Sequence, residues 1–407
     1  MFLSDRSRFA VNPIEEEDMV ALELEKKGKK IIKLNRGDPP KFFPTPKYIV
    51  DAYAEALERG KTAYSKADGE DMLKEAIINR YRRMYKLGFK DDDIIVTAGI
   101  SEALSFINSA LINDGDMGIL FRPAYPMYMP QLELYGGKPL MAQYDEKDGW
   151  SVHLDVLRKK LEGVKSRGLA KRIKYMMVTN PNNPTGTVLD RKVLEDVVDI
   201  ANEHDVLLIS DEIYDEIVYN GAKFTSISEV AKGMPHMILN GASKDYDSTG
   251  FRIGFAIVPE EDRRSKELKG ALYKYATVRL SVNTPAQYAV AAAINNVREH
   301  NRSIRKMTKE IEKRANHATS LLKESPYFDV VEPNGAFYVF PRINMDRLKL
   351  KNDREFVDLL LKEEDVQVTR GSGFEEPSHF RIVALPPKEI LDRAINRIDA
   401  FCKRHSR

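Results

Sequence analysis

The segment with the clearest chemical potential is Ser243–Gly254, which follows the apolar run Met237–Leu239. It places Lys244 just beyond a predicted buried strand and Arg252 eight residues further on. Both cations could simply lie in solvent, as most charged side chains do. Alternatively, partial burial and a cationic neighbour would lower the pKa of Lys244 from its usual value of about 10.4 and make it a Schiff-base nucleophile. Arg252 would then bind a phosphate group.

A carboxylate and a phenol follow a second apolar run. Asp211 and Tyr214 come directly after Val206–Ile209 and Ser210. Ligands of open α/β sheets bind at the carboxyl ends of the strands. Asp211 could cap the next helix, which is a common role for aspartate. Alternatively, its carboxylate would keep a ligand's ring nitrogen protonated, and Tyr214 would supply a phenol to a nearby oxygen.

Three further loops follow predicted strands. The turn 180–186 contains Asn183 and is rich in Asn, Pro and Gly, a composition that needs no function. The segment 97–104 is a strand, a small-residue turn and a helix, which can bind an anion through helix amides, although Ser101 could equally be a helix cap. In the segment 122–128, Tyr125 could be a core residue or could stack on a planar ligand.

Together the five loops offer an amine, a guanidinium, a carboxylate, helix amides, a side-chain amide and an aromatic face. One kind of ligand matches all of these groups: a phosphorylated pyridine aldehyde with a protonated ring. The sequence therefore predicts one composite site for such a ligand at the strand ends.

The sequence pattern around these loops predicts an α/β fold. Between residues 94 and 257, short apolar runs alternate with amphipathic helical stretches such as 190–201. Continuous apolar strands are buried on both faces, which indicates a mainly parallel sheet flanked by helices. The apolar runs are 94–97, 119–120, 175–178, 206–209, 237–239 and 253–257.

The last 120 residues or so have a different pattern, typical of a smaller α+β domain. We expect a long charged helix at 299–324, strands at 328–331, 336–340 and 380–383, and helices near 353–363 and 387–403. The predicted division is an N-terminal arm at 1–44 that contributes to the small domain, a large cofactor-binding domain at 45–290, and a small C-terminal domain at 291–407.

Composition narrows the possible partners of the 407-residue chain. Lys plus Arg number 64 and Asp plus Glu 62, so a net charge of +2 argues against nucleic acid or an anionic membrane as the main partner. We expect no transmembrane helix and no signal peptide, because no long apolar stretch occurs. The single cysteine, Cys402, fits a reducing cytoplasm, and the scattered histidines predict no metal site.

The ordered motifs, from Leu34–Pro39 to Phe380–Arg381, resemble those of the fold-type I, pyridoxal-phosphate-dependent aminotransferases of class I/II. Within that family the chain resembles the archaeal alanine aminotransferases. The segments that carry this likeness are 23–28, 36–39, 279–287, 371–374 and 385–387.

This resemblance implies a role for each motif residue at the cofactor, pyridoxal 5′-phosphate. Lys244 would bind the cofactor covalently and then shuttle protons, and Asp211 would pair with the pyridinium nitrogen. Tyr125 would stack on the ring. The phosphate ligands would be Arg252, Ser243 and the amides of Ile100 and Ser101, while Tyr214 and Asn183 would reach the phenolic oxygen.

The resemblance also implies how substrate and partner subunit are bound. Arg381 would hold the substrate α-carboxylate in a bidentate fork, with contacts from Asn183 and the Gly37 amide. Tyr64 would reach the phosphate in the neighbouring subunit, so the family likeness predicts a homodimer with its sites at the interface.

Two departures from the family pattern concern the substrate. The chain has Gly37-Asp38-Pro39-Pro40 where Gly-x-Pro-Asp is common, so the substrate entrance is expected to differ in shape. It has Ser101 where some aspartate-specific relatives carry lysine, which argues against a dedicated aspartate pocket. The expected reaction is alanine with 2-oxoglutarate, giving pyruvate and glutamate.

Alternative functions remain open at this point. The enzyme could be an aspartate or aromatic amino acid aminotransferase, or a carbon–sulfur lyase of the same fold, which would share every cofactor residue. A cofactor-binding transcription regulator would need a basic DNA-binding domain, and about 30 residues before the first motif leave no room for one. A binding protein without chemistry would leave the set of Lys244, Asp211, Arg252 and Arg381 unexplained.

Overall fold

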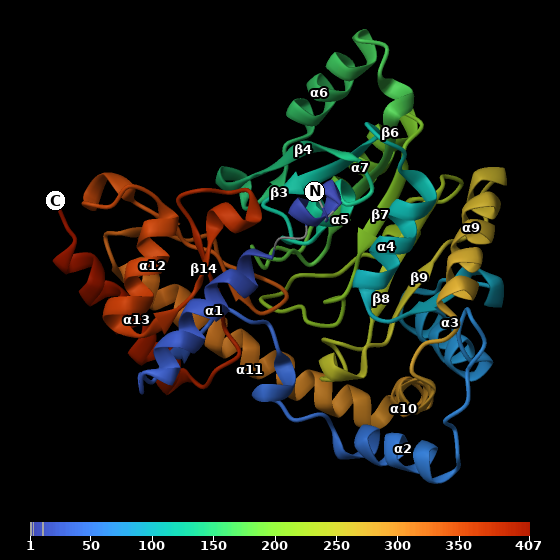
Figure 1. Cartoon of the computed structure of the whole chain (residues 1–407), viewed down its shortest axis with the longest axis horizontal. Helices are drawn as coiled ribbons and strands as arrows, with labels where there is room; N and C mark the ends of the chain where they lie inside the picture. The colour runs from blue at the N-terminus through green and yellow to red at the C-terminus, as the bar shows by residue number, and fades with distance from the viewer. Residues whose placement is uncertain (1, 3, 10–11) are drawn as a thin grey trace.

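An eight-stranded sheet forms the centre of the computed structural model, which describes residue 2, residues 4–9 and residues 12–407 (Figure 1). The strand order is β2-β9-β8-β7-β6-β3-β4-β5. The inner pairs β8–β7, β7–β6, β6–β3 and β3–β4 are parallel, whereas β9 runs antiparallel to both its neighbours and β5 antiparallel to β4. The prediction of an α/β fold with a mainly parallel sheet is therefore confirmed.

The strands of this sheet are β2 (Ile94–Thr97), β3 (Met117–Arg122), β4 (Lys138–Asp145), β5 (Ser151–Val152), β6 (Ile173–Thr179), β7 (Leu207–Asp211), β8 (His236–Gly241) and β9 (Gly254–Ile257). The helices associated with it are α2 (Lys47–Glu58), α3 (Asp71–Tyr85), α4 (Ile100–Leu111), α5 (Tyr128–Glu133), α6 (Leu154–Ser166), α7 (Arg191–Glu203), α8 (Ile227–Val230), α9 (Arg263–Arg279) and α10 (Thr284–Asn295).

Helices cover both faces of the sheet, which is why its strands are apolar throughout. Every residue of β2, β8 and β9 is buried. Along β6, Met176 and Val178 pack in one apolar core with α3, α6, α7 and α10, while Tyr175 and Met177 pack in another with α4, α5 and α9. Side chains alternate between the faces of a strand, so a continuous apolar run supplies both cores.

The C-terminal region forms a third core around smaller sheets. Its elements are α11 (Val297–Glu324), β10 (Phe328–Asp329), β11 (Tyr338–Val339), β12 (Arg342–Ile343), α12 (Asp353–Glu364), β13 (Val366–Gln367), β14 (Thr369–Arg370), β15 (Phe380–Val383) and α13 (Lys388–Arg404). Strand β11 is shorter than the predicted strand 336–340, because Ala336 has a φ of +50° and Pro341 cannot donate to a ladder.

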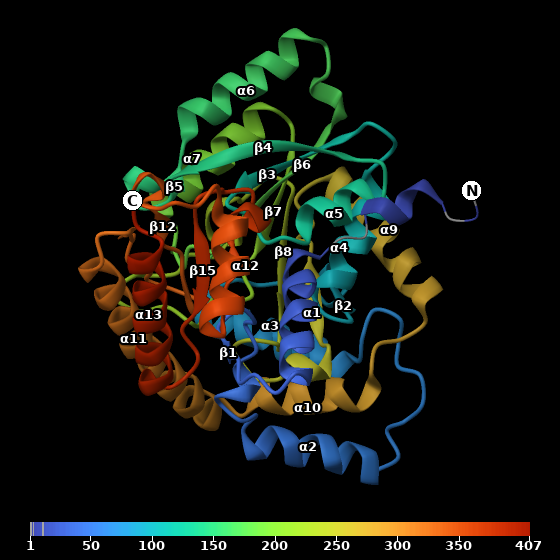
Figure 2. The ribbon, with the colours of Figure 1, turned by 60° about the vertical axis from the view of Figure 1, so that its left-hand side comes forward.

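The N-terminal segment packs against this C-terminal region. It contributes α1 (Pro13–Lys26) and β1 (Ile32–Lys33), and β1 pairs in parallel with β13. Figure 2 shows α1 beside the C-terminal elements α12 and β15. Buried Asp18 of α1 accepts hydrogen bonds from Asn35 at 2.7 Å and from Gln367 at 2.8 Å. Residues from both ends of the sequence are thus brought to one side of the large sheet.

Within the described residues, no helix is long and apolar enough to cross a membrane.

Candidate active site

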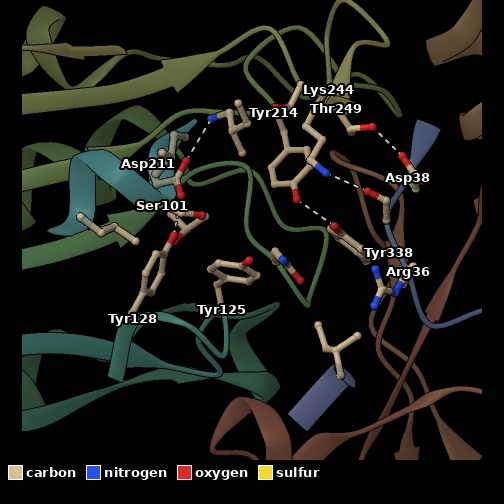
Figure 3. Close-up of a pocket in the computed structure, with 18 of the residues that line it drawn as sticks. Arg36, Asp38, Ser101, Tyr125, Tyr128, Asp211, Tyr214, Lys244, Thr249 and Tyr338 are labelled. Carbon is tan, nitrogen blue, oxygen red and sulfur yellow. Dashed lines mark hydrogen bonds between the residues drawn. The ribbon is translucent and has the colours of Figure 1, made fainter. Parts of the chain in front are cut away.

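A cavity of about 440 Å³ lies where the carboxyl ends of the parallel strands meet the N-terminal segment and the C-terminal region. Figure 3 shows side chains from these three parts of the chain around it. Its lining residues are Asn12, Ile14, Glu15, Arg36, Gly37, Asp38, Ile100, Ser101, Leu104, Tyr125, Tyr128, Thr179, Asn183, Asp211, Ile213, Tyr214, Ser243, Lys244, Thr249, Gly250, Arg252, Tyr338 and Arg381. All the predicted site residues except Tyr64 are among them.

Lys244 follows β8 and carries a buried amine with a lowered pKa. Its Nζ donates a hydrogen bond to the carbonyl oxygen of Gly37 at 2.7 Å. Burial lowers the pKa of Lys244 to about 8; nearby Asp38 opposes this shift, whereas Arg381 and Arg252 add to it. The predicted lowering by burial and cationic neighbours is therefore present, with burial as its main cause.

Asp211 ends β7 as a buried carboxylate, 5% exposed. Tyr128 Oη donates to its Oδ2 at 2.6 Å, and the Ile213 amide donates to its Oδ1 at 3.2 Å. Burial raises the pKa of Asp211 to about 6, against the opposing effect of these two hydrogen bonds. The next helix, α8, begins only at Ile227, so the alternative of a helix cap at Asp211 is wrong. A buried carboxylate of this kind suits a cationic partner.

The start of α4 forms an anion cradle with Arg252. The helix cap is Gly99, not Ser101, and its φ is +77°. A Cβ atom on Gly99 would lie 2.4 Å from Arg252 Nη2, and one on Gly254 would lie within 2.8 Å of the Gly99 backbone. These two glycines let the guanidinium approach the helix N-terminus, whose first amides have no intrahelical acceptor. Ser243 lines the same cavity.

Arg381, on β15, is a buried guanidinium without a carboxylate partner in the part of the chain that the structure describes. It is 1% exposed, its Nη1 donates to Asn183 Oδ1 at 2.9 Å, and its Nη2 donates to the Asn35 carbonyl oxygen. Its Nε is buried without a hydrogen-bond partner. Burial lowers the pKa of Arg381. Because an unpaired buried charge is costly, this arrangement favours a bound anion.

Aromatic side chains shape the rest of the cavity. The guanidinium of Arg381 lies 4.6 Å from the ring centroid of Tyr338 and 4.8 Å from that of Phe374. The hydroxyls of Tyr214 and Tyr338 are 2.7 Å apart and share a hydrogen bond. Tyr125 also lines the cavity and lies between Tyr128 and Tyr338 in the view of Figure 3. Its predicted stacking on a ligand ring stays a prediction.

Tyr64 is the predicted site residue that does not line this cavity. Its side chain is 82% exposed, and its predicted contact with a neighbouring subunit stays a prediction.

Several lining residues were not predicted from the sequence. Tyr128 donates a hydrogen bond to Asp211, and the Thr179 hydroxyl shares one with the Tyr128 hydroxyl. Tyr128 could have been found, since it lies in the same aromatic segment as Tyr125. Nothing in the local sequence marks Tyr338 or the α1 residues Ile14 and Glu15, because they reach the cavity through long-range packing.

The donor set fits pyridoxal phosphate. The cradle at Arg252 and α4 suits a dianion, Lys244 suits an aldehyde, and Asp211 suits a protonated ring nitrogen. Arg381, with its unpaired Nε, remains free for a substrate carboxylate.

Comparisons with known proteins agree with this geometry. A family model described as aminotransferase class I and II matches residues 29–398. The chain is 33% identical over 384 residues to the glutamate-pyruvate aminotransferase AlaA of Haemophilus influenzae, covering 94% of this chain and 93% of that protein. It is also 33% identical over 388 residues to an aspartate aminotransferase of Bacillus sp. strain YM-2, covering 94% of each. The solved alanine aminotransferase of Pyrococcus furiosus matches with a TM-score of 0.93 and 37% identity, covering 99% of this chain and 100% of that one.

Proposed function

The chain belongs to the class I and II aminotransferases, which are pyridoxal-phosphate-dependent enzymes, and we propose that it moves the amino group of L-alanine to 2-oxoglutarate, giving pyruvate and glutamate. The observation that carries this proposal is the shared cavity of Arg381 and Lys244. A buried guanidinium that pairs with no carboxylate of the described residues, together with an amine of pKa about 8, suits an α-amino acid. Relatives named for alanine support the choice of donor.

Each site residue has a defined task in this proposal. The cofactor supplies an electrophilic aldehyde and an electron-accepting ring. Lys244 Nζ would hold the cofactor at its aldehyde carbon and, once replaced there by the substrate amine, would carry the proton that the substrate α-carbon loses to the cofactor. The Asp211 carboxylate would keep the ring nitrogen protonated, while Arg252, Ser243 and the α4 amides would hold the phosphate.

The substrate is oriented by its α-carboxylate. Arg381 Nε and Nη groups bind it in a fork, and Asn183 keeps the guanidinium in place through the 2.9 Å hydrogen bond. Tyr214 and Tyr338, already joined by a hydrogen bond, flank the reacting groups. Both donor and acceptor carry an α-carboxylate, so the same fork serves both halves of a ping-pong cycle.

We propose that the enzyme is a homodimer in which Tyr64 completes the partner's phosphate site. The exposed apolar residues Tyr64, Val278 and Leu280 support an interface, since their side chains are 82%, 83% and 55% exposed in the single chain. Mixing Lys244→Ala with Tyr64→Phe subunits should restore activity, because each heterodimer then holds one intact site. A monomeric, fully active enzyme in sedimentation would contradict the dimer.

The division into an arm at 1–44, a cofactor domain at 45–290 and a small domain at 291–407 is also a proposal. The β1–β13 pairing supports a unit made from both ends of the chain. A cytoplasmic location is proposed from the single cysteine, Cys402, which is buried.

The substrate proposal is tested with a panel of amino acids. Each is added to the purified holoenzyme, and the absorbance change of the cofactor from its imine to its amine form is followed. We expect alanine and glutamate to react best. A tenfold preference for aspartate or an aromatic amino acid would refute the alanine proposal, and release of a β-substituent would identify a lyase.

A further inference from the structure

A fourth cation faces the reaction cavity, and none of the tasks above uses it. Among the described residues, the cations that line the cavity are Lys244, Arg252, Arg381 and Arg36. The first three have places at the aldehyde, the phosphate and the α-carboxylate. Figure 3 shows Arg36 beyond Tyr338, at the end of the cavity away from Asp211. Arg36 thus carries positive charge to the end of the cavity that lies away from the carboxylate assigned to the ring nitrogen.

Two carboxylates of α1 hold the Arg36 guanidinium. Its Nε donates to Asp18, and its Nη2 donates to Glu15. Asp18 is fixed, because its side chain is only 12% exposed and it also accepts hydrogen bonds from Asn35 and Gln367. Asp18 therefore orients Arg36 whatever the cavity contains.

Glu15 differs from Asp18 in every respect that decides whether it can be displaced. Its side chain is 55% exposed and has Arg36 as its single hydrogen-bond partner within the described residues. Glu15 also lines the cavity. Exposed ion pairs contribute little to stability, because solvent screens them and both long side chains lose freedom. Another carboxylate can therefore replace Glu15 at Arg36 without a large cost.

The proposed reaction needs a cation whose charge can be either neutralised or exposed to the substrate. Its two amino donors differ in that alanine ends in a methyl group and glutamate in a second carboxylate. A permanently unpaired cation would disfavour the methyl group, and a neutral wall would disfavour the carboxylate. Asp38, which lies beside Lys244 and accepts a hydrogen bond from Thr249 at 2.6 Å, adds negative charge nearby and makes a cation more necessary.

We propose that Arg36 receives the side-chain carboxylate of dicarboxylic substrates and that Glu15 is its displaceable counter-ion. When alanine or pyruvate is bound, Glu15 neutralises Arg36. When glutamate or 2-oxoglutarate is bound, the substrate carboxylate takes the place of Glu15, while Asp18 keeps the guanidinium oriented. This inference rests on the proposed function, because it assigns the second substrate of the same site.

The test compares both half-reactions of the Arg36→Met holoenzyme. We expect kcat/KM for glutamate and 2-oxoglutarate to fall roughly 10- to 150-fold, the range for lost hydrogen bonds to a charged group. The values for alanine and pyruvate should stay within about threefold, because a methyl group makes no contact of this strength. Equal losses for all four substrates, or no loss for any, would overturn the proposal.

Glu15→Gln provides the opposite variant. It removes the competing carboxylate, so glutarate, a dicarboxylate with no amino or keto group, should bind severalfold more tightly and raise the melting temperature more than it does in the parent enzyme. Arg36→Met should abolish that shift. Glutarate binding that is unchanged in both variants would count against the assignment.

Glu16→Gln is the matched control. Glu16 is the next residue of α1, but it pairs with Arg370 and does not line the cavity. The Glu16→Gln variant should leave kcat/KM for all four substrates and the affinity for glutarate unchanged. If the parent enzyme uses aspartate instead of alanine, the substrate proposal fails while the Arg36 test can still be run with aspartate. If it accepts no dicarboxylic substrate, the Arg36 proposal fails and the aminotransferase family stands.

Discussion

The loops after β7 and β8 carry two sets of buried charges, one facing the reaction cavity and one facing α3 and α11. Lys244 and Tyr214 line the cavity, whereas the residues that follow them, Asp245 and Asp215, lie with Arg80 of α3 in a second cluster. The same short segments thus build an active site on one side and a buried ionic cluster on the other.

The two sets differ in how their charges are compensated. In the cluster, Arg80 Nη2 donates to Asp215 at 2.8 Å and to Glu216 at 2.9 Å, and His300 of α11 lies 2.9 Å from Glu216. Although burial opposes it, Arg80 and His300 lower the pKa of Glu216 to about 2. In the cavity, burial instead brings Lys244 and Asp211 to pKa values of about 8 and 6, close to neutral pH.

This difference separates chemistry from stability. Paired charges such as those of Arg80 and Glu216 hold buried elements together, whereas charges left facing a cavity can exchange protons and bind ligands. Removing a cavity charge should therefore cost activity, and removing a cluster charge should cost stability.

Lys244→Ala should produce the largest effect on the cavity side. Turnover should fall by at least about 10⁴-fold, because the variant loses both the cofactor linkage and the proton carrier. Pyridoxal phosphate should still bind through Arg252 and the α4 amides, and the melting temperature should not fall. Near-normal turnover would end the assignment of Lys244, as would a borohydride-fixed chromophore on another residue.

Arg80→Met should produce the largest effect on the cluster side. It leaves the carboxylates of Asp215 and Glu216 buried without their cation, so the free energy of unfolding should fall by about 3–5 kcal/mol. The folded fraction should keep kcat within a few-fold, as measured below the unfolding transition. Arg82→Met, at an exposed position of the same helix, should change stability by less than about 0.5 kcal/mol. A stable but inactive Arg80→Met enzyme would break the comparison.

Asp211→Ala should slow the proton-transfer step by roughly 10²–10³-fold, because the ring nitrogen loses the charge that keeps it protonated. Single-turnover absorbance measurements separate this step from substrate binding, which should change far less. Tyr128→Phe is the milder companion, since it removes one hydrogen bond and leaves the carboxylate. A change in the Michaelis constant alone would make Asp211 a structural residue.

Arg381→Lys should lower kcat/KM for every amino donor, because lysine keeps the charge but cannot form the fork. The loss should correspond to roughly 1–3 kcal/mol of transition-state stabilisation. This uniform loss contrasts with the selective loss expected for Arg36→Met. Steady-state kinetics with alanine and glutamate tests it, and a loss confined to one donor would reassign Arg381.

The smallest effect should be seen in the pH dependence of the rate at which the cofactor-free enzyme binds pyridoxal phosphate again through Lys244. With a pKa of about 8, the neutral fraction of the Lys244 amine rises about tenfold between pH 7 and 9 and then levels off, and the binding rate should follow it. For a lysine of ordinary pKa, the neutral fraction would continue to rise above pH 9. The unfolded chain binds more protons than the native one between pH 8 and 10.5, so the stability of the cofactor-free protein should rise across that window. Recapture rates that keep rising above pH 9 would contradict this pKa.

The cavity side of the comparison could be predicted from sequence, and the cluster side could not. Lys244 and Asp211 each follow a continuous apolar run, and parallel strands bring such loops to one edge of the sheet. Asp215 and Asp245 follow the same runs, but their partner Arg80 lies in α3, and no local pattern in the sequence links these positions.

The contacts of Arg36 at the rim of the cavity, made by Glu15 and Asp18, could not be predicted from the sequence either. Glu15 and Asp18 reach Arg36 because α1 packs against the C-terminal region, a contact that depends on pairing between β1 and β13. Local periodicity finds helices and strands, but it does not show which distant segments will meet. The sequence therefore indicated no role for Arg36 beyond its place in segment 36–39, which resembles the family.

The β1–β13 pairing also sets an order in time on the ribosome. Residues 32–33 are synthesised before the central sheet, but the strand they pair with, at 366–367, is synthesised after it. The central sheet and Lys244 can form on the growing chain before that, while α1, Arg36 and Gly37 have no docking partner yet. A nascent chain would therefore hold the reactive lysine before it holds the rim that selects substrates. The reactive lysine and the segment that carries Arg36 thus reach their final places at different times.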